Sequence, residues 1–224
     1  MKAAGTSRAR GIRALAIALA VLVAAPTLLV PAVARAEDLK ITLVAPLSGR
    51  WARQGQLKKM GAEMAIAEIN GAGGIKALAG GKIVLREADA GDSVEKAVSA
   101  AQRALSREKI SVGMGSWLSS FTLGVTEVAE RLQVPWFTLS YADNITERGF
   151  KYTFQTSPVS SLQAEQALDL IVDLARKNNQ QIKKAALVGD NTAAIVFFFK
   201  PVREKLLKAK GIEIVVDEVW TPPL

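Results

Sequence analysis

Cysteine and histidine are both absent from the 224-residue sequence. Their absence excludes disulfides, thiolate chemistry, zinc sites built on these residues, and the Ser-His-Asp and Cys-His nucleophile pairs of many hydrolases. An enzyme of this composition would have to use carboxylates, Lys, Tyr or a magnesium-type ion. The loops that follow the predicted strands hold no pair of carboxylates in an evident acid/base arrangement. We therefore expect a protein that is not an enzyme and that needs no metal or other cofactor.

Acidic residues are missing from the first 36 positions, which hold five of the 29 basic residues. The formal charge of +8 therefore reflects this segment as much as the rest of the chain. Without it, 24 basic residues face 21 acidic ones, and these charges are interspersed along the predicted helices. Because a surface that binds the phosphates of a nucleic acid needs clustered cations, we expect no nucleic-acid partner.

The N-terminus has the three parts of an export signal. Lys2 to Arg13 is basic, Ala14 to Ala25 is apolar, and Ala34-Arg-Ala36 has the small-residue pattern of a cleavage site. A membrane anchor is the alternative, since Ala14 to Ala34 runs for 21 residues without a charge. Two prolines in this stretch favour cleavage. We predict a signal peptide over residues 1–36 and a soluble mature chain exported to the periplasm.

Beyond the leader, short apolar runs alternate with segments of helical periodicity. This alternation is typical of βαβ units and predicts an α/β fold with a doubly wound, mainly parallel sheet. Ser93 precedes one helix in the position of a cap. The expected strands are Leu39–Ala45, Lys82–Ala88, Ile110–Met114, Val134–Leu139, Tyr152–Gln155, Lys184–Gly189 and Ile212–Val219. The expected helices cover Gln56–Asn70, Ser93–Arg107, Val125–Leu132, Ala164–Ala175 and Phe199–Ala209.

Three loops should meet at one rim of this sheet. In doubly wound sheets ligands bind beyond the carboxyl ends of the strands, and Pro46–Gln54, Gly115–Thr122 and Ser140–Thr146 each follow a predicted strand. The Glu87–Asp92 stretch also follows a strand, but it lacks the spacing of a calcium loop, and we interpret it as a strand-to-helix turn. The three loops are therefore the candidate ligand site.

The loop Gly115–Thr122 is rich in hydroxyls and precedes a helix. Ser119 or Ser120 falls where that helix begins, and its free N–H groups and positive dipole end favour an anion. This arrangement suits a carboxylate bound without a formal cation. Alternatively, Ser119 or Ser120 only caps the helix. Ser116, at the end of the strand, offers a further hydroxyl.

The two other loops contribute aromatic and charged groups. Tyr141 offers an aromatic wall and an O–H, and Trp51, beside two arginines, offers a flat apolar wall or is a surface residue packed on its loop. Asp143 could meet an ammonium group. We favour its alternative role as a cap of the Asn144–Arg148 turn.

Three segments together resemble a known family. They are "PLSGRWARQGQLKKMGAEMAIAEINGAGGI" (46–75), "VGMGSWLSSFTLGVTEVAERLQVPWFTLSYADNITERGFKYTFQTSP" (112–158) and the stretch from "KKAALVGDNTA" to "GIEIVVDEVW" (183–220). The sequence is similar to the solute-binding proteins of branched-chain amino-acid ABC transporters, the LivJ or leucine-binding family with the type I periplasmic-binding fold.

The resemblance implies a clamp of two lobes that closes over a ligand. Its first lobe would span residues 37–156, and residues 157–224 would form a partial second lobe. An amino acid, an amide or an aromatic acid would bind in the cleft and pass to an ABC permease, with the binding protein acting as a monomer. A periplasmic sensor of the same fold is the alternative that the sequence leaves open.

The resemblance also implies site residues. Ser119 with Ser120 and the backbone near Tyr141–Asp143 would hold the ligand carboxylate, Trp51 would wall the pocket, and the Asp190–Ala193 loop would close over it. The loops and the resemblance together give a candidate ligand-binding set of Trp51, Ser116, Ser119, Ser120, Ser140, Tyr141, Ala142, Asp143, Asn191 and Thr192.

Two features depart from the family pattern. The chain stops after two strands and two helices of the expected second lobe, so we interpret it as C-terminally shortened and expect weak or absent ligand binding. The run Ile195–Phe199 ("IVFFF") stands where the family commonly has an aromatic-glycine pair. We expect this run to be exposed, and prone to aggregation, unless another segment covers it.

Overall fold

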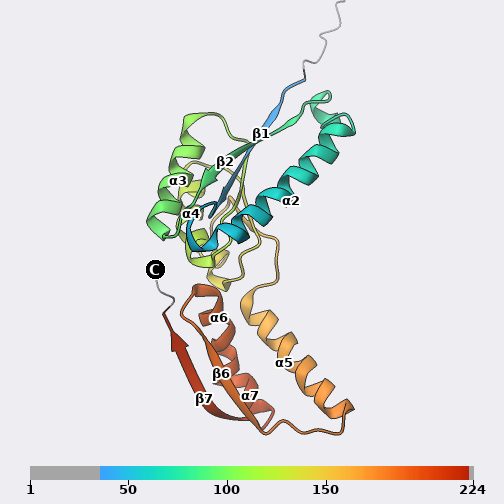
Figure 1. Cartoon of the computed structure of the whole chain (residues 1–224), viewed down its shortest axis with the longest axis vertical. Helices are drawn as coiled ribbons and strands as arrows, with labels where there is room; N and C mark the ends of the chain where they lie inside the picture. The colour runs from blue at the N-terminus through green and yellow to red at the C-terminus, as the bar shows by residue number, and fades with distance from the viewer. Residues whose placement is uncertain (1–35, 222–224) are drawn as a thin grey trace, which may run out of the picture. The chain divides into compact units, whose positions relative to one another are not determined.

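The computed structural model describes residues 36–221 of the chain. Its larger sheet has five parallel strands in the order β2-β1-β3-β4-β5 (Figure 1). Because each parallel neighbour needs a crossover, helices alternate with these strands along the chain. The strands are β1 (Leu39–Ala45), β2 (Ile83–Asp89), β3 (Val112–Gly115), β4 (Trp136–Thr138) and β5 (Thr153–Gln155).

Helices cover this sheet unequally. The helices α3 (Val94–Arg107) and α4 (Ser119–Arg131) pack together over one face, whereas α2 (Ala52–Gly71) lies on the other side of β1 and β2 (Figure 1). The main core lies under α3 and α4, and α2 buries Gly55 alone among its residues. This core consists of Val44, Ala90, Ala97, Ala100, Ala101, Leu105, Ile110, Phe121, Val125, Val128, Ala129, Val134 and Trp136.

A second sheet of two parallel strands follows the long helix α5 (Ser160–Lys177). Its strands are β6 (Lys184–Asp190) and β7 (Glu213–Trp220). Between them, α6 (Ala193–Pro201) runs through a π-helical segment, η5 (Val202–Leu206), into α7 (Leu207–Ala209). Their common core holds Ala164, Leu187, Phe199, Val202, Leu207 and Ile212.

Most predicted elements are present, with shifted ends. The third strand begins at Val112 rather than Ile110, and the helix expected from Val125 already begins at Ser119. Ser93 is the predicted cap, since its side chain accepts a hydrogen bond from the Lys96 N–H at 3.2 Å. The predicted fold class is therefore correct at the level of element order and sheet type.

The prediction for the Ile195–Phe199 run is wrong. This run belongs to α6, which begins at Ala193 instead of Phe199, and the helical turn places Phe199 in the second core at 9% exposure. Ile195 and Phe198 pack partly buried against the same core, while Val196 faces outward. The prediction overestimated the exposure of these five apolar residues, because a helix turns only some of them outward.

The predicted signal peptide lies almost wholly outside the described residues, and the predicted lobe boundaries stay predictions. In the part of the chain that the structure describes, no helix combines the length and the apolar character that crossing a bilayer requires.

Candidate functional site

A cavity of about 300 Å³ opens where the loops after β1 and β3 meet the first turn of α3. Gly55 lets α2 begin close to the first of these loops, since a Cβ there would lie 1.9 Å from the Pro46 carbonyl oxygen. The cavity thus lies beyond the carboxyl ends of the parallel strands, as the sheet topology requires. Its lining residues are Arg50, Trp51, Asp92, Ser93, Val94, Glu95, Leu118, Ser120, Phe121, Asn191, Thr192 and Thr221.

An aromatic pair backs one side of this cavity. Trp51 packs on Trp117 with ring centroids 4.9 Å apart and planes tilted by 52°. The Arg50 guanidinium carbon lies 5.8 Å from the centre of the Trp51 ring, which places a cation beside the indole face. Trp117 was not among the predicted site residues. It stands in the Gly115–Thr122 loop, where its aromatic ring was a signal that an emphasis on hydroxyls overlooked.

Ser119 and Ser120 have different surroundings. Ser120 is partly exposed and lines the cavity, whereas Ser119 is buried, and its hydroxyl oxygen accepts the N–H groups of Tyr141 and Ala142, each at 3.1 Å. The alternative that either serine caps α4 is wrong, because Leu118 occupies the cap position and makes no side-chain bond. Since both lone pairs of the Ser119 oxygen are engaged, only its proton is left to donate.

Ser140 and Ser116 lie in the interior and do not line the cavity. The Ser140 hydroxyl lies 2.6 Å from that of Thr122, accepts from the Thr138 hydroxyl at 3.0 Å and donates to the Trp117 carbonyl at 3.0 Å. The Ser116 hydroxyl has no hydrogen-bond partner among residues 36–221. The network of Ser140 holds the second and third rim loops together.

Tyr141 and Asp143 also lie off the cavity. Tyr141 is 46% exposed. The Asp143 carboxylate is buried and accepts hydrogen bonds from the N–H of Ser161, at 3.1 Å, and from its hydroxyl. Asp143 therefore caps the first turn of α5 and not, as predicted, the Asn144–Arg148 turn, whose 3₁₀ segment has no side-chain cap.

The predicted second-lobe residues do reach the cavity. Asn191 and Thr192 line it together with Thr221, and the Asn191 side-chain amide donates to the Thr221 hydroxyl at 3.0 Å. The N–H of Thr192 is held by Asp190 at 2.9 Å. Trp51, Ser120, Asn191 and Thr192 are thus the members of the predicted set that line one cavity.

Sequence reasoning missed Asp89, which holds the first rim loop in place. Its carboxylate accepts the N–H groups of Leu47 at 2.8 Å, Ser48 at 3.2 Å and Gly91 at 2.8 Å, and the Ser48 hydroxyl as well. Burial acts to raise the pKa of Asp89, but the hydrogen bonds from Ser48, Gly91 and Leu47 outweigh it and lower this pKa below its ordinary value. Asp89 therefore holds the backbone of the Pro46–Gln54 loop in place.

Arg148 is a second residue whose role was missed. Its guanidinium donates to the carbonyl of Leu123 at 3.0 Å and to the hydroxyl of Thr126 at 2.5 Å, and its Nε donates to the Asn144 carbonyl at 3.1 Å. Burial lowers its pKa, and the ring of Phe150 lies 4.3 Å away. Arg148 thus ties α4 to the loop that follows β4.

In the described part of the chain, no group of three or more acidic side chains is placed to hold a metal ion. The carboxylate of Asp92, which lines the cavity, is paired with Lys96 at 2.7 Å. The cavity therefore presents hydroxyls, the Trp51 indole and the Arg50 cation to a ligand.

Residues 38–224 match the family model described as "Periplasmic binding protein". The chain belongs to the periplasmic binding protein family. The resemblance seen in the sequence is thereby confirmed, and so is the fold class. In this family's terms the chain has the type I fold.

Relatives and solved structures agree with this assignment. The Leu/Ile/Val-binding protein homolog 8 of Brucella abortus is 33% identical over 136 residues, which cover 60% of this chain and 33% of that protein. LivJ of Streptococcus pneumoniae, solved in complex with isoleucine, is 26% identical with a TM-score of 0.68, covering 84% of this chain and 51% of that one. A solute-binding protein of Rhodopseudomonas palustris, solved with 3,4-dihydroxy benzoic acid, is 25% identical with a TM-score of 0.66, covering 81% and 47%.

The chain spans about a third of the length of that Brucella protein and about half of each solved structure. The ligands of those proteins are therefore properties of those proteins, and a ligand for this chain is a proposal.

Proposed function

We propose that this chain is the ligand-capturing part of an exported, periplasmic solute-binding protein of an ABC transporter. It binds a small carboxylate with an apolar body, such as a branched-chain amino acid or an aromatic acid, and presents it to a membrane permease. The proteins of known structure that resemble it were solved with isoleucine and with 3,4-dihydroxy benzoic acid, which share those two chemical parts.

The observation that carries this proposal is the composition of the rim cavity. Arg50 and the hydroxyl of Ser120 offer donors for a carboxylate, while Trp51, Leu118 and Phe121 offer apolar surface. The spare proton of Ser119 belongs to the residue before Ser120 at the start of α4, where helix N–H groups already favour negative charge. A ligand whose carboxylate lies near the start of α4 and whose apolar body lies against Trp51 fits this distribution.

The two acids that line this cavity are unsuited to general acid catalysis. The hydrogen bond from Lys96 and its positive charge lower the pKa of Asp92, so this carboxylate stays ionised at neutral pH. Hydrogen bonding to its own backbone N–H and to Ser93 lowers the pKa of Glu95 as well. Neither acid can act as a proton donor near pH 7, and general acid catalysis needs a donor whose pKa lies near the working pH.

Titration of the chain with leucine, isoleucine and benzoate, followed by backbone NMR, tests the proposal. We expect weak binding, with a dissociation constant of about 1 mM or higher, and shifts centred on Trp51, Ser119 and Ser120. Leucinamide, which lacks the carboxylate, is the matched control ligand and should cause smaller shifts. Equal shifts with leucinamide, or shifts spread away from the rim loops, would refute the proposed site.

A further inference from the structure

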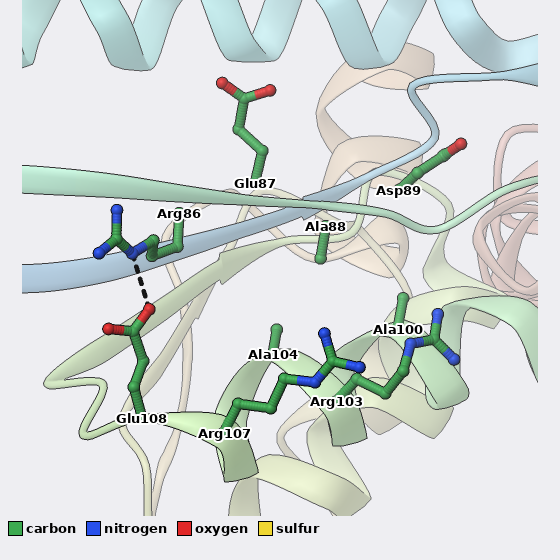
Figure 2. Close-up of a pocket in the computed structure, with 9 residues that line it drawn as sticks. All are labelled: Arg86, Glu87, Ala88, Asp89, Ala100, Arg103, Ala104, Arg107 and Glu108. Carbon is green, nitrogen blue, oxygen red and sulfur yellow. Dashed lines mark hydrogen bonds and ion pairs between the residues drawn. The ribbon is translucent and has the colours of Figure 1, made fainter.

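A second, open groove of about 310 Å³ lies between β2 and α3 (Figure 2). Ala88 on β2 faces Ala100 and Ala104 on α3 across this groove, and three arginines stand around it (Figure 2). Arg103 and Arg107, one turn apart on α3, extend their guanidinium groups toward β2, which carries Arg86 (Figure 2). The lining residues are Arg86, Glu87, Ala88, Asp89, Ala100, Arg103, Ala104, Arg107 and Glu108.

The acidic residues of this groove are already engaged elsewhere. Glu108 is held by Arg86 at 2.7 Å and by Lys40 at 2.6 Å. Glu87 points to the opposite face of the strand (Figure 2), where it pairs with Lys59 at 3.2 Å. Asp89 binds the first rim loop. By contrast, Arg103 and Arg107 form no ion pair with any residue from 36 to 221.

The groove runs along an open sheet edge, because β2 is the outermost strand. Hydrogen bonds from the Leu39 N–H to the Lys82 carbonyl and from the Ala90 N–H to the Ala45 carbonyl, both 2.8 Å, turn the even-numbered residues of β2 toward β1. The odd-numbered backbone groups therefore face outward. Those of Ile83 are bound by the side chain of Asn70, at 2.8 and 2.9 Å.

Farther along this edge, the outward backbone groups of Leu85 and Glu87 have no hydrogen-bond partner within the described residues. An unpaired stretch of strand edge is a template for another strand. It lies beside two arginines whose charge is also unpaired. Backbone donors and acceptors thus alternate along the same groove that carries the free cations.

We propose that this edge of β2 docks an extended, acidic segment of a protein partner as an added strand. Its backbone pairs with Leu85 and Glu87, and those of its side chains that face α3 are carboxylates that meet Arg103 and Arg107. A nucleic-acid strand fits less well, because its backbone has no alternating N–H and C=O groups to pair with the outward groups of Leu85 and Glu87.

Binding of a fluorescein-labelled peptide of alternating Asp and Val tests the charge part of the proposal. The double variant Arg103→Gln with Arg107→Gln should weaken binding by about tenfold, the product of two partly exposed ion pairs. The double variant Lys205→Gln with Lys208→Gln is the matched control, because it removes the same amount of positive charge. Both lysines are exposed and lack an ion pair among residues 36–221. Equal weakening by both double variants would overturn the proposal.

Amide hydrogen exchange tests the strand part. The Asp-Val peptide should slow exchange at Leu85 and Glu87 and leave the inward amide of Arg86 unchanged, whereas a peptide of alternating Lys and Val should have no effect. Two results together would show a simple anion site and overturn the proposal. Inorganic phosphate would displace the peptide completely, and the peptide would leave the amides of Leu85 and Glu87 unprotected. Tighter binding of oligo-dT than of the peptide would also overturn the proposal.

Discussion

Single side chains decide the geometry of the rim. Asp89 gathers the backbone of Leu47 and Ser48, and this fixes the start of the loop that carries Arg50 and Trp51 into the cavity. Ser119 in the same way fixes the backbone of Tyr141 and Ala142. Both residues lie at strand or helix ends, where backbone N–H groups lack partners within their own element, so one oxygen can satisfy several of them.

Replacing Asp89 by Asn should lower the free energy of unfolding by about 1–2 kcal/mol at pH 7, since an amide oxygen accepts these hydrogen bonds more weakly than a carboxylate. The folded-state pKa of Asp89 lies below the ordinary value of 3.8. Its contribution is therefore complete above the unfolded-state pKa and is lost as the pH falls through the lower, folded-state pKa.

Urea unfolding at several pH values between 2 and 7 measures this effect. The wild type should lose stability more steeply than Asp89→Asn below about pH 4, because the variant has no carboxylate to protonate. Parallel pH curves for the two proteins would show that Asp89 does not clamp the loop.

Replacing Ser119 by Ala should weaken carboxylate binding by about 1–3 kcal/mol and should also destabilise the fold, because the N–H groups of Tyr141 and Ala142 lose their acceptor. Ser120→Ala, which removes a cavity hydroxyl without a backbone partner in the described residues, should weaken binding and leave stability within about 0.5 kcal/mol. Calorimetric titration and thermal unfolding separate the two effects. An unchanged affinity of the Ser119→Ala variant would show that the Ser119 hydroxyl does not donate to the ligand.

At the scale of elements, a charge pair joins η5 to β7, and an aromatic side chain of α6 packs on β6. Arg203 donates to both oxygens of Asp217, each at 2.6 Å, and this hydrogen bonding lowers the pKa of Asp217. The Arg203 guanidinium also lies 5.0 Å from the ring of Phe199. Phe199 packs so closely on β6 that a Cβ at Gly189 would lie 2.7 Å from its ring.

Phe199→Ala should therefore destabilise the region of β6 and β7 by about 3–5 kcal/mol, through lost burial and the cavity left behind. Val196→Ala, on the same helix but 46% exposed, is the matched control and should change stability by less than about 0.5 kcal/mol. Amide exchange along β6 and β7 measures the effect. Similar protection in both variants would mean that the Phe199 ring is not part of a closed core.

At the scale of the whole molecule, apolar surface remains on the face of the larger sheet opposite α3 and α4. Phe137 and Phe154 stack with centroids 5.1 Å apart, yet they are 40% and 44% exposed, and Leu139 beside them is 55% exposed. A patch of this kind marks a surface that binds other apolar groups. Exposed apolar surface was predicted for Ile195–Phe199, but the structure has such a surface on the larger sheet instead.

The double variant Leu139→Ser with Phe154→Thr should reduce binding of the dye ANS and slow concentration-dependent association, with a small change in unfolding free energy because both side chains are half exposed. Leu170→Ser on α5, equally exposed but away from this patch, is the control. Fluorescence and analytical ultracentrifugation provide the measurements. Unchanged dye binding would place the apolar surface elsewhere.

Local sequence determined the order of strands and helices, the Ser93 cap and the three loops at one end of the sheet, because hydrophobic period and capping chemistry act over a few residues. Tertiary structure alone decided which polar groups meet. Asp143 binds Ser161, eighteen positions away, and Asp89 binds a loop some forty positions before it. Such pairings depend on strand order and helix placement, which no short stretch of sequence contains.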